Sequence, residues 1–342
     1  MKALVYHGPR DLTVDDWEDP VPGPHEVKLA PRYVGICGSD LHGYTGSSGR
    51  RIPPMIMGHE IAAVVEELGP EVTSLHVGDR VTVQPIMFCG TCDYCRQGLT
   101  NVCANRRGLG VMDVNGAFCE HFTMPEDNVI RIPEGVSDKA AAMMDPFGVV
   151  FRAIKYAAPV AGKNILIVGS GTIGLFFMKL AKYFGAKSVV VSDLSADRLE
   201  IASRMGADLV VNPKDQDVNE FLRQHGLEDQ IDVAVECVGV SPTAKQSIDC
   251  VRTNGLVIWI GNAAKMIEID MQSVVTRSVR VQGTYGFTDA DFREALEFLS
   301  TSGLNIDDMA TSVVTLDQAP ETFERLCRGA GTDLKVLVQI ND

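Results

Sequence analysis

Four cysteines lie close together in one short segment, at Cys89, Cys92, Cys95 and Cys103. Their spacing, C-x2-C-x2-C-x7-C, lets one loop bring four thiolates to a single ion, and four thiolates suit tetrahedral Zn2+. Because the protein would fill every coordination position, no position remains for substrate, and we expect a structural zinc. An iron–sulfur cluster can use similar thiolate spacing, but a redox cluster has no evident electron-transfer partner in this chain.

A second pattern is the glycine turn Gly169-x-Gly171-x-x-Gly174, which follows an apolar stretch and opens a helical one. Gly169 permits a tight turn, Gly171 lets backbone N–H groups approach a pyrophosphate, and Gly174 permits close packing of helix against strand. The phosphates would lie at the positive end of the helix dipole, next to Thr172 and Ile173. The pattern predicts a dinucleotide site, although a glycine-rich turn without a ligand is the alternative.

The residue at the end of the next expected strand bears on the choice of dinucleotide. Asp193 comes 19 residues after Gly174, a separation that suits a carboxylate accepting hydrogen bonds from the adenine ribose hydroxyls. A negative charge there repels a 2′-phosphate, which favours NAD over NADP. Arg198 leaves the alternative open, because an arginine nearby can accommodate that phosphate.

A third group of candidate ligands is dispersed in the sequence. Cys37 lies in the segment Gly35–His42, and His59 and Glu60 follow Gly58. A thiolate, an imidazole and a carboxylate can hold Zn2+ with one position open, as catalytic zinc requires. Single Cys and His residues are more often buried structural groups, so spacing alone leaves both interpretations open.

These candidate sites need two different scaffolds. Up to about residue 150 the chain is rich in Gly and Pro, and short apolar stretches alternate with turn signals. This pattern predicts short strands in a β-rich domain, such as a small barrel. The stretches are Val27–Leu29, Ile61–Val65 and Arg80–Val83.

The following part alternates strands with helices, which predicts an α/β fold with a parallel, doubly wound sheet. The six expected strands are Ile165–Val168, Ser188–Ser192, Leu209–Val211, Asp232–Val235, Leu256–Ile260 and Val279–Gln282. The expected helices are Gly174–Phe184, Ala196–Met205 and Pro242–Arg252, the last with Ser241 as N-cap. After Phe287 we expect one helix, Asp289–Ser300, and a final strand, Lys335–Ile340. Spacing does not decide whether this tail joins the sheet or returns to the first domain.

Length and charge exclude several classes of function. The 342 residues suit about two domains, and a formal net charge of −14 disfavours binding to nucleic acid or to an anionic membrane surface. No apolar run approaches the ~20 residues that span a bilayer, and the N-terminus turns acidic too early for a signal peptide. We therefore expect a cytoplasmic protein whose nine cysteines are thiols or metal ligands rather than disulfides.

Taken in order, these motifs resemble those of the zinc-dependent medium-chain alcohol dehydrogenases along the whole chain. The matching segments are Cys37-Gly-Ser-Asp40, Gly58-His-Glu60, Gly78-Asp-Arg-Val81, the four-cysteine loop and the glycine turn. The resemblance implies a GroES-like catalytic domain over 1–150, completed by 288–342, and a Rossmann NAD-binding domain over 151–287. It also implies one catalytic and one structural zinc, and a homodimer or homotetramer.

Within this family the chain is similar to polyol and threonine dehydrogenases alike. Met144–Gly148 and Gly283–Gly286 resemble the threonine type, whereas Asp193–Leu199 resembles the sorbitol type. We predict oxidation of a secondary alcohol (a polyol, sugar alcohol or sugar-alcohol phosphate) to a ketone by hydride transfer to NAD. An L-threonine 3-dehydrogenase is the alternative. A zinc-free quinone or enoyl reductase would lack the zinc ligands, and the intact motifs disfavour a non-catalytic relative.

The resemblance also assigns the ligands of the catalytic zinc. They would be Cys37, His59, Glu60 and Asp145, with Glu60 binding directly or exchanging with water. Asp145 stands where polyol dehydrogenases usually have Glu and other alcohol dehydrogenases have Cys. Its side chain is one methylene shorter than Glu, so direct ligation, ligation through water and support from outside the coordination sphere all remain open.

The remaining roles concern proton transfer and the nicotinamide. Asp40 would orient His59, and Ser39 and His42 would carry the alcohol proton outward. The alternatives are a hydroxyl that bonds its own turn for Ser39 and a solvated surface residue for His42. Residues expected to line the nicotinamide are Cys237, Val238, Gly239, Ile260 and Gly261.

Overall fold

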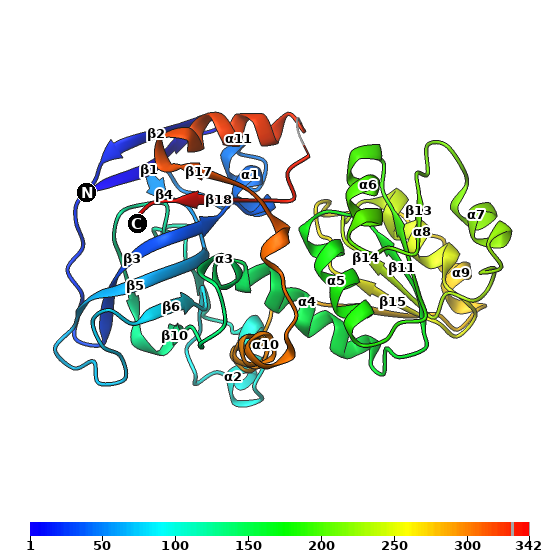
Figure 1. Cartoon of the computed structure of the whole chain (residues 1–342), viewed down its shortest axis with the longest axis horizontal. Coiled ribbons are helices and arrows are strands. Elements are labelled where there is room, and N and C mark those ends of the chain that lie inside the picture. Colours follow the sequence, from blue (N-terminus) through cyan, green and yellow to red (C-terminus); the bar gives the residue numbers. More distant parts are fainter. Residues whose placement is uncertain (330–331, 342) are drawn as a thin grey trace. The chain divides into compact units, whose positions relative to one another are not determined.

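The computed structural model describes residues 1–329 and 332–341, and the chain divides into two compact units (Figure 1). The first unit comprises Met1–Pro146 and Phe287–Asp342, and the second comprises Phe147–Gly286. Helix α4, Met144–Ala157, begins in the first unit and continues into the second. The structure thus places the C-terminal segment with the N-terminal part of the chain.

The first unit is built on a seven-stranded sheet in the order β10-β6-β5-β3-β18-β17, with β9 paired to β3. Its strands are β3 (Glu26–Gly35), β5 (Glu60–Leu68), β6 (Arg80–Val83), β9 (Phe122–Pro125), β10 (Val129–Arg131), β17 (Ala310–Thr315) and β18 (Lys335–Gln339). The pairings are antiparallel except that of β17 with β18. Because β18 pairs with β3, the tail returns to the first unit and does not join the doubly wound sheet.

Smaller elements complete this unit. A three-stranded sheet has the order β2-β1-β4, and β7 pairs with β8. These strands are β1 (Lys2–Gly8), β2 (Asp11–Asp16), β4 (Met55–Ile56), β7 (Ile86–Met87) and β8 (Arg107–Gly108). The helices are α1 (Gly38–Tyr44), α2 (Asp93–Arg96), α3 (Asp138–Ala142), α10 (Asp289–Ser302) and α11 (Ala319–Cys327). One continuous core joins β1, β3 and β5 to β18 and α11, through buried side chains such as Leu4, Leu29, Phe118 and Phe323.

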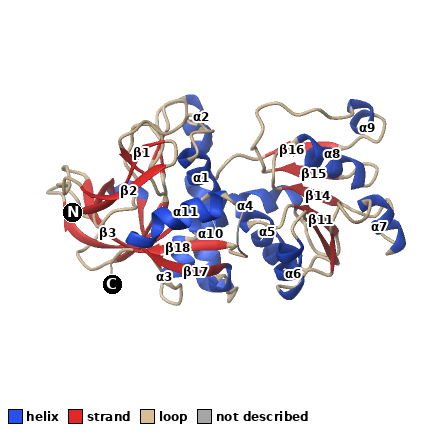
Figure 2. Ribbon diagram, turned by 90° about the horizontal axis from the view of Figure 1, so that it is seen from above, coloured by secondary structure: helices blue, strands red, loops and turns tan. Residues whose placement is uncertain are grey.

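The second unit is a six-stranded sheet in the order β13-β12-β11-β14-β15-β16. Every pairing is parallel, and the order is that of a dinucleotide-binding Rossmann sheet. The strands are β11 (Asn164–Val168), β12 (Ser188–Ser192), β13 (Leu209–Val211), β14 (Val233–Glu236), β15 (Leu256–Trp259) and β16 (Arg280–Gly283). The helices are α5 (Thr172–Tyr183), α6 (Ala196–Arg204), α7 (Val218–Gln224), α8 (Ser241–Cys250) and α9 (Met271–Val275), and Figure 2 shows them on both faces of the sheet.

The α/β class and the parallel six-stranded sheet predicted from the sequence are confirmed. Two local predictions are wrong. Ser241 is the first residue of α8, whose N-cap is Val240, and the Ser241 hydroxyl accepts a hydrogen bond from Glu268 N at 2.9 Å. The tail also contains β17 and α11, which were not expected. The residues of β17 alternate only between half-buried and exposed positions, so the strand has no fully buried apolar face to mark it in the sequence.

Among the described residues, no helix is both long enough and apolar enough to cross a bilayer.

Candidate active site and metal centres

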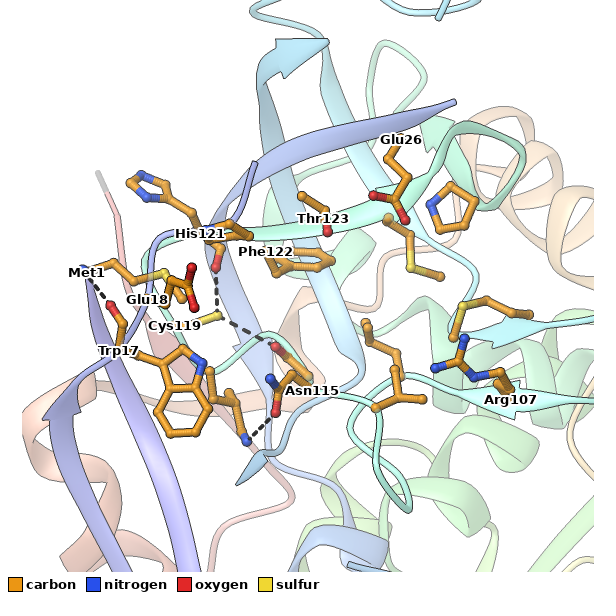
Figure 3. A pocket seen from close by; sticks show the side chains of 18 residues that line it. Met1, Trp17, Glu18, Glu26, Arg107, Asn115, Cys119, His121, Phe122 and Thr123 are labelled. Carbon is orange, nitrogen blue, oxygen red and sulfur yellow. Dashed lines mark hydrogen bonds between the residues drawn. The ribbon is translucent and has the colours of Figure 1, made fainter. Parts of the chain in front are cut away.

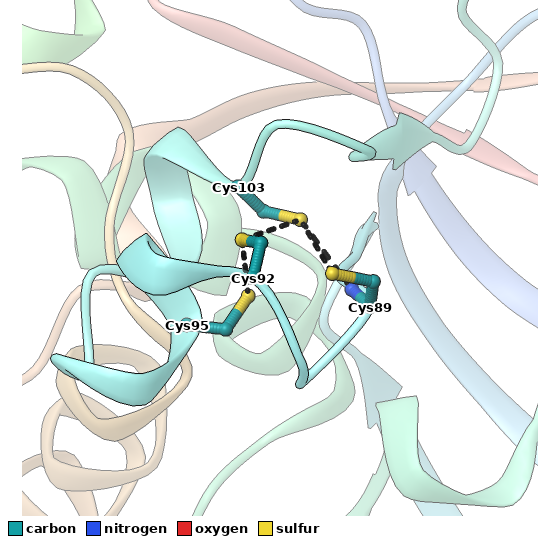
Figure 4. A group of neighbouring side chains, drawn as sticks. All are labelled: Cys89, Cys92, Cys95 and Cys103. Carbon is teal, nitrogen blue, oxygen red and sulfur yellow. Dashed lines mark hydrogen bonds between the residues drawn. The ribbon is translucent and has the colours of Figure 1, made fainter.

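The four cysteines of the predicted loop converge on one point (Figure 4). The Sγ–Sγ distances are 3.5 Å from Cys92 to Cys95, 3.9 Å from Cys92 to Cys103 and 3.5 Å from Cys103 to Cys89. A tetrahedral site with Zn–S bonds of about 2.3 Å has edges of about 3.8 Å. The arrangement therefore fits a four-thiolate zinc site. It is built by α2, with Cys92 as its N-cap, and by the turns on either side.

The loop also prepares some of these thiols for ionisation. Backbone N–H groups of Thr91 and Cys92 lower the pKa of Cys89 to about 5. Burial and the neighbouring sulfur atoms instead raise the pKa of Cys95 to about 12. Four adjacent thiolates repel one another, so a bound cation is needed before all four can be ionised together.

The dispersed candidates also meet. One ligand atom each from Cys37, His59 and Glu60 lies within 4.8 Å of the others. Cys37 is the N-cap of α1, and Glu60 is the first residue of β5. Gly35 faces Glu60 across the β3–β5 pairing, and a Cβ atom on Gly35 would lie 2.1 Å from Glu60 Oε2. Glycine at this position therefore leaves room for the carboxylate.

The imidazole of His59 is oriented between two groups on α1. Its Nδ1 lies 3.4 Å from Asp40 Oδ1, and its Nε2 lies 3.4 Å from Ser39 Oγ. Asp40 Oδ2 accepts a hydrogen bond from Cys37 N at 3.1 Å. Because Nδ1 faces Asp40, Nε2 is the nitrogen left to bind a metal. The buried Nδ1 has no hydrogen bond of good geometry within the protein.

Charge at this group is balanced by neighbouring side chains. Burial raises the pKa of Asp40, but His59 and Arg51 outweigh it and hold that pKa below its usual range. Burial lowers the pKa of His59, but Asp40 and Cys37 outweigh it and raise that pKa well above its usual value. A metal ion at this position must therefore displace a proton from His59, so we expect acid to weaken metal binding.

Glu60 has a cationic partner that the sequence did not reveal. Lys335 Nζ, at the start of β18, lies 2.8 and 2.7 Å from the two carboxylate oxygens and 3.0 Å from Ile36 O. The side chains of Lys335 and Glu60 are 3% and 0% exposed. Burial lowers the pKa of Lys335, but Glu60 and Cys37 outweigh it, so the ammonium stays charged.

Asp145 and His42, the other predicted residues of this site, do not join the three converging ligands. Asp145, in the first turn of α4, is not among the three residues whose ligand atoms converge. Burial, with Glu60 and Asp40 nearby, raises its pKa to about 7. His42 is exposed, and its Nδ1 lies 3.4 Å from Ser47 Oγ. Ligation by Asp145 and proton transfer through His42 stay predictions.

The glycine turn has the expected form. It joins β11 to α5, whose N-cap is Gly171. Gly169 has φ +99°, and a Cβ atom on Gly174 would lie 1.9 Å from Gly169 O. A Cβ atom on Gly171 would meet nothing within 4 Å. The turn is thus tight on the protein side and open at Gly171, and the next residues, Thr172 and Ile173, form the first turn of α5.

Asp193 follows β12 and contacts this turn. Its Oδ2 accepts hydrogen bonds from Ser170 N at 2.8 Å and Ser170 Oγ at 2.9 Å, and its Oδ1 accepts one from Ser195 N at 2.9 Å. The carboxylate is half-buried. Arg198 is exposed in the first turn of α6. The carboxylate is therefore fixed beside the glycine turn.

The residues expected to line the nicotinamide lie at the carboxyl ends of the adjacent strands β14 and β15, on loops that touch each other. A Cβ atom on Gly239 would lie 2.3 Å from Asn262 N, and one on Gly261 would lie 2.3 Å from Gly239 N. Ligands of open α/β sheets bind at this edge. The loop residues are Cys237, Val238, Gly239, Ile260 and Gly261.

A separate cavity of about 290 Å³ lies in the first unit (Figure 3). Trp17, Phe122 and Met124 form part of its wall, with Glu26 and Arg107 at its polar positions. Cys119 donates to His121 O at 3.1 Å, and burial raises the pKa of this thiol. None of the predicted site residues lines this cavity.

Comparison with known proteins decides the family. The model of the alcohol dehydrogenase GroES-like domain matches residues 23–134, and the model of the zinc-binding dehydrogenases matches residues 172–301. An L-threonine 3-dehydrogenase of Saccharopolyspora erythraea is 36% identical over 95% of both chains. The chain belongs to the zinc-dependent medium-chain alcohol dehydrogenase family. It is therefore an oxidoreductase of this family, and the predicted GroES-like and Rossmann folds are confirmed.

Other members of the family differ in name, and one of them was solved with a bound dinucleotide. A sorbitol dehydrogenase of Halalkalibacterium halodurans is 33% identical over 99% of both chains. A protein of Sinorhizobium meliloti 1021, described as a candidate zinc-binding dehydrogenase and solved bound to NADP, has a TM-score of 0.91 and 30% identity. It covers 99% of this chain and 98% of its own. The names of these relatives include both the threonine type and the sorbitol type, which are also the two types that the local sequence motifs resemble.

Two residues of this dehydrogenase were missed by the sequence analysis. Lys335 lies 275 positions from Glu60, and Arg51 forms an ion pair with Asp40. Neither stands in a short motif with a metal-ligand spacing. Strand pairing of β18 with β3 and the loop before β4 bring them to the site, so no local signal could have identified them.

Proposed function

We propose that this dehydrogenase oxidises a secondary alcohol, of the polyol, sugar-alcohol or sugar-alcohol phosphate class, to a ketone with NAD. The proposal is supported chiefly by the convergence of Cys37, His59 and Glu60 within 4.8 Å, beside the hydroxyl of Ser39. Three protein ligands with one open position are the arrangement of catalytic zinc. The four-cysteine loop would hold a second, structural zinc.

The chain's own residues would position the reaction. Zinc, when bound, supplies Lewis-acid polarisation of the alcohol hydroxyl, and NAD accepts the hydride. Cys37, His59 and Glu60 would hold the ion and leave space for substrate. Ser39 Oγ, which lies 3.4 Å from His59 Nε2, would accept the alcohol proton. His42 lies three residues further on α1, on the same helix face and exposed to solvent, where it would release the proton.

The dinucleotide would bind at the glycine turn of the second unit. The open backbone at Gly171 and the N-terminus of α5 would receive the pyrophosphate. Asp193 would accept hydrogen bonds from the adenine ribose, which favours NAD over NADP. Arg198, exposed on α6, is the residue that would counteract this preference.

A turnover screen tests the proposed substrate class. Purified protein should reduce NAD with at least one polyol, sugar alcohol or sugar-alcohol phosphate, measured by NADH absorbance at neutral to alkaline pH. The Cys37→Ser variant is the control for turnover that depends on the catalytic metal. Turnover of no secondary alcohol in the panel, or turnover unchanged in Cys37→Ser, would contradict the proposal.

The second candidate is oxidation of L-threonine. The 36% identity to an L-threonine 3-dehydrogenase and the segments Met144–Gly148 and Gly283–Gly286 favour it. The chemistry is the same, since L-threonine carries a secondary hydroxyl. Including L-threonine in the panel separates the candidates, because the preferred substrate is the one with the largest kcat/KM.

We also propose a homodimer or homotetramer in the cytoplasm. Strand β16 ends the six-stranded sheet, and it exposes Val281. Met271 and Val275 on α9 are 73% and 63% exposed. An exposed edge strand with apolar neighbours is a template for pairing with a second copy.

Light scattering should show a dimer or larger species, and Val281→Lys should favour the monomer. Val313→Lys, on β17, is the matched control, since Val313 is exposed on the end strand of the other large sheet.

A further inference from the structure

We infer that Arg51 is a positioning residue of the catalytic zinc site, which acts through Asp40 on the orientation of His59. The inference rests on the proposed function, because it assumes that His59 binds zinc. Arg51 belongs to no motif of the chain, and its side chain is buried although it carries a full charge. The ion pair with Asp40 has exposed side-chain fractions of 3% and 0%.

The contacts form a chain from Arg51 to the candidate ligand. Arg51 Nη2 donates to Asp40 Oδ1 at 3.1 Å, and the same oxygen lies 3.4 Å from His59 Nδ1. The other oxygen of Asp40 accepts the N–H of Cys37. Asp40 is therefore held at both oxygens, one by the segment that carries Cys37 and the other by Arg51. Only a carboxylate fixed in this way presents a constant acceptor to Nδ1.

The backbone of Arg51 is fixed from outside the site. Met112 N donates to Arg50 O at 2.8 Å, and Ile52 N donates to Met112 O at 3.1 Å. Arg51 Nη1 also lies 3.3 Å from Arg50 O, and Nη2 lies 3.5 Å from Ser39 O. The backbone on both sides of Arg51 is thus held by Met112, while its guanidinium also bonds Ser39 O on α1.

Helix α1 leaves a specific space for this side chain. A Cβ atom on Gly43 would lie 2.7 Å from Arg51 Cγ and 3.1 Å from Arg51 Nε. The Cγ atom is near the root of the side chain and cannot move aside without displacing the whole arginine. Gly43 is therefore required for Arg51 to reach Asp40, which provides a second way to disturb the contact.

Electrostatics explains why Arg51 matters to His59. A buried carboxylate is stable in its charged form only when it is paired. Without the guanidinium, Asp40 would keep only the contacts to Cys37 N and His59, and its charge would be less well compensated. A rotation of the Asp40 carboxylate would remove the acceptor that fixes the tautomer and ring plane of His59.

The test is the rate at which each zinc leaves the full-length protein, followed by the absorbance of a zinc-binding dye. Cys37→Ser and Cys92→Ser assign the two phases to the catalytic and structural sites. Arg51→Met should release the catalytic zinc about 10- to 100-fold faster, a factor equal to the loss of metal affinity that follows removal of outer hydrogen-bond partners of metal ligands. The structural zinc should leave at the wild-type rate and serves as an internal control for unfolding.

Three further variants complete the test. Arg80→Met is the matched control, since it removes an arginine–aspartate pair of the same unit, with Asp138, and it should change neither phase. Gly43→Ala should reproduce the Arg51→Met effect. In an Asp40→Asn background, Arg51→Met should add little to the rate, because Arg51 acts through Asp40.

The possible results are distinct. Selective acceleration of the catalytic phase by both Arg51→Met and Gly43→Ala supports the inference. Acceleration of both phases equally, no acceleration, or an undiminished effect in the Asp40→Asn background overturns it. A wild-type protein with a structural phase but no phase that Cys37→Ser abolishes would overturn the proposed function, and the inference with it.

Discussion

Two groups of side chains in this protein have the chemistry of metal ligands, but they differ in whether a coordination position remains open for substrate. Cys89, Cys92, Cys95 and Cys103 surround one point with four sulfur atoms. Cys37, His59 and Glu60 provide the three ligand atoms that converge among the described residues. A filled coordination shell suits a structural role, and an open one suits catalysis. Replacing one cysteine in each group should therefore have different consequences.

Cys37→Ser should abolish turnover and leave the fold largely intact, because it removes a ligand from the open site. Cys92→Ser should mainly lower the thermal unfolding temperature, because it opens the closed site that ties the loop together. Initial rates and thermal melts of both variants check this. Equal losses of stability in the two variants would contradict the division of roles.

Asp193 should set the preference between the two dinucleotides. The wild-type protein should have a higher kcat/KM for NAD than for NADP. Asp193→Asn should shift the ratio toward NADP by about fivefold or more, since removing a repulsion of ~1 to 4 kcal/mol changes binding by at least about fivefold. Asp197→Asn, an exposed aspartate on α6, is the control and should leave the ratio unchanged. Equal kcat/KM values for both dinucleotides in the wild type would refute the assignment.

At the scale of elements, the candidate active site depends on how the strands pair. Strand β3 has β5 on one side, which brings Glu60, and β18 on the other, which brings Lys335. Helix α1 follows β3 and carries Ser39, Asp40 and His42. The C-terminal strand is thus part of the site.

Lys335→Met should destabilise the first unit, because it leaves the buried carboxylate of Glu60 without its cation. Breaking a buried pair from one side costs about 3–5 kcal/mol, and a bound zinc should reduce this loss. Urea unfolding in a Trp259→Phe background, with Trp17 as the fluorophore of the first unit, measures the free energy of unfolding with and without zinc.

The control is Lys28→Met, which removes the less buried pair with Asp19 (side chains 11% and 46% exposed). This variant should cost less than about 1 kcal/mol. A loss in Lys335→Met no larger than that of this control would show that the pair is not important for stability.

For the whole molecule, the two kinds of cofactor belong to different units. Both candidate metal groups lie in the first unit, and the glycine turn lies in the second. We therefore expect metal binding and dinucleotide binding to stabilise different cores. Loss of metal should affect the two units unequally.

Elemental analysis should find about two zinc ions per chain, one for each ligand group. Removing them with a chelator should speed amide hydrogen exchange in α1, α2 and β5 of the first unit, while strands β11, β12 and β14 of the second keep their protection. Mass spectrometry of peptides resolves the two units in the same sample. Iron in place of zinc, the absence of metal, or equal loss of protection in both units would contradict this prediction.

The parts of this protein that the sequence predicted well are local. The glycine turn and the four-cysteine loop each lie within one short stretch of chain, so spacing alone determines which atoms meet. The strands of the parallel sheet were also identified within a residue or two, because strands buried on both faces form continuous apolar runs. The family motifs added Cys37, His59 and Glu60, which the structure brings together; Asp145 stays a predicted ligand.

Tertiary structure alone decided the contacts that join distant segments. Lys335 meets Glu60 because β18 pairs with β3, and Arg51 meets Asp40 because Gly43 leaves space on α1. The destination of the tail was decided in the same way. Such contacts depend on strand partners and on the packing of side chains between elements, and neither leaves a periodic or spaced pattern in the sequence. The sequence thus determined which chemical groups the protein carries, and the fold determined which of them support one another.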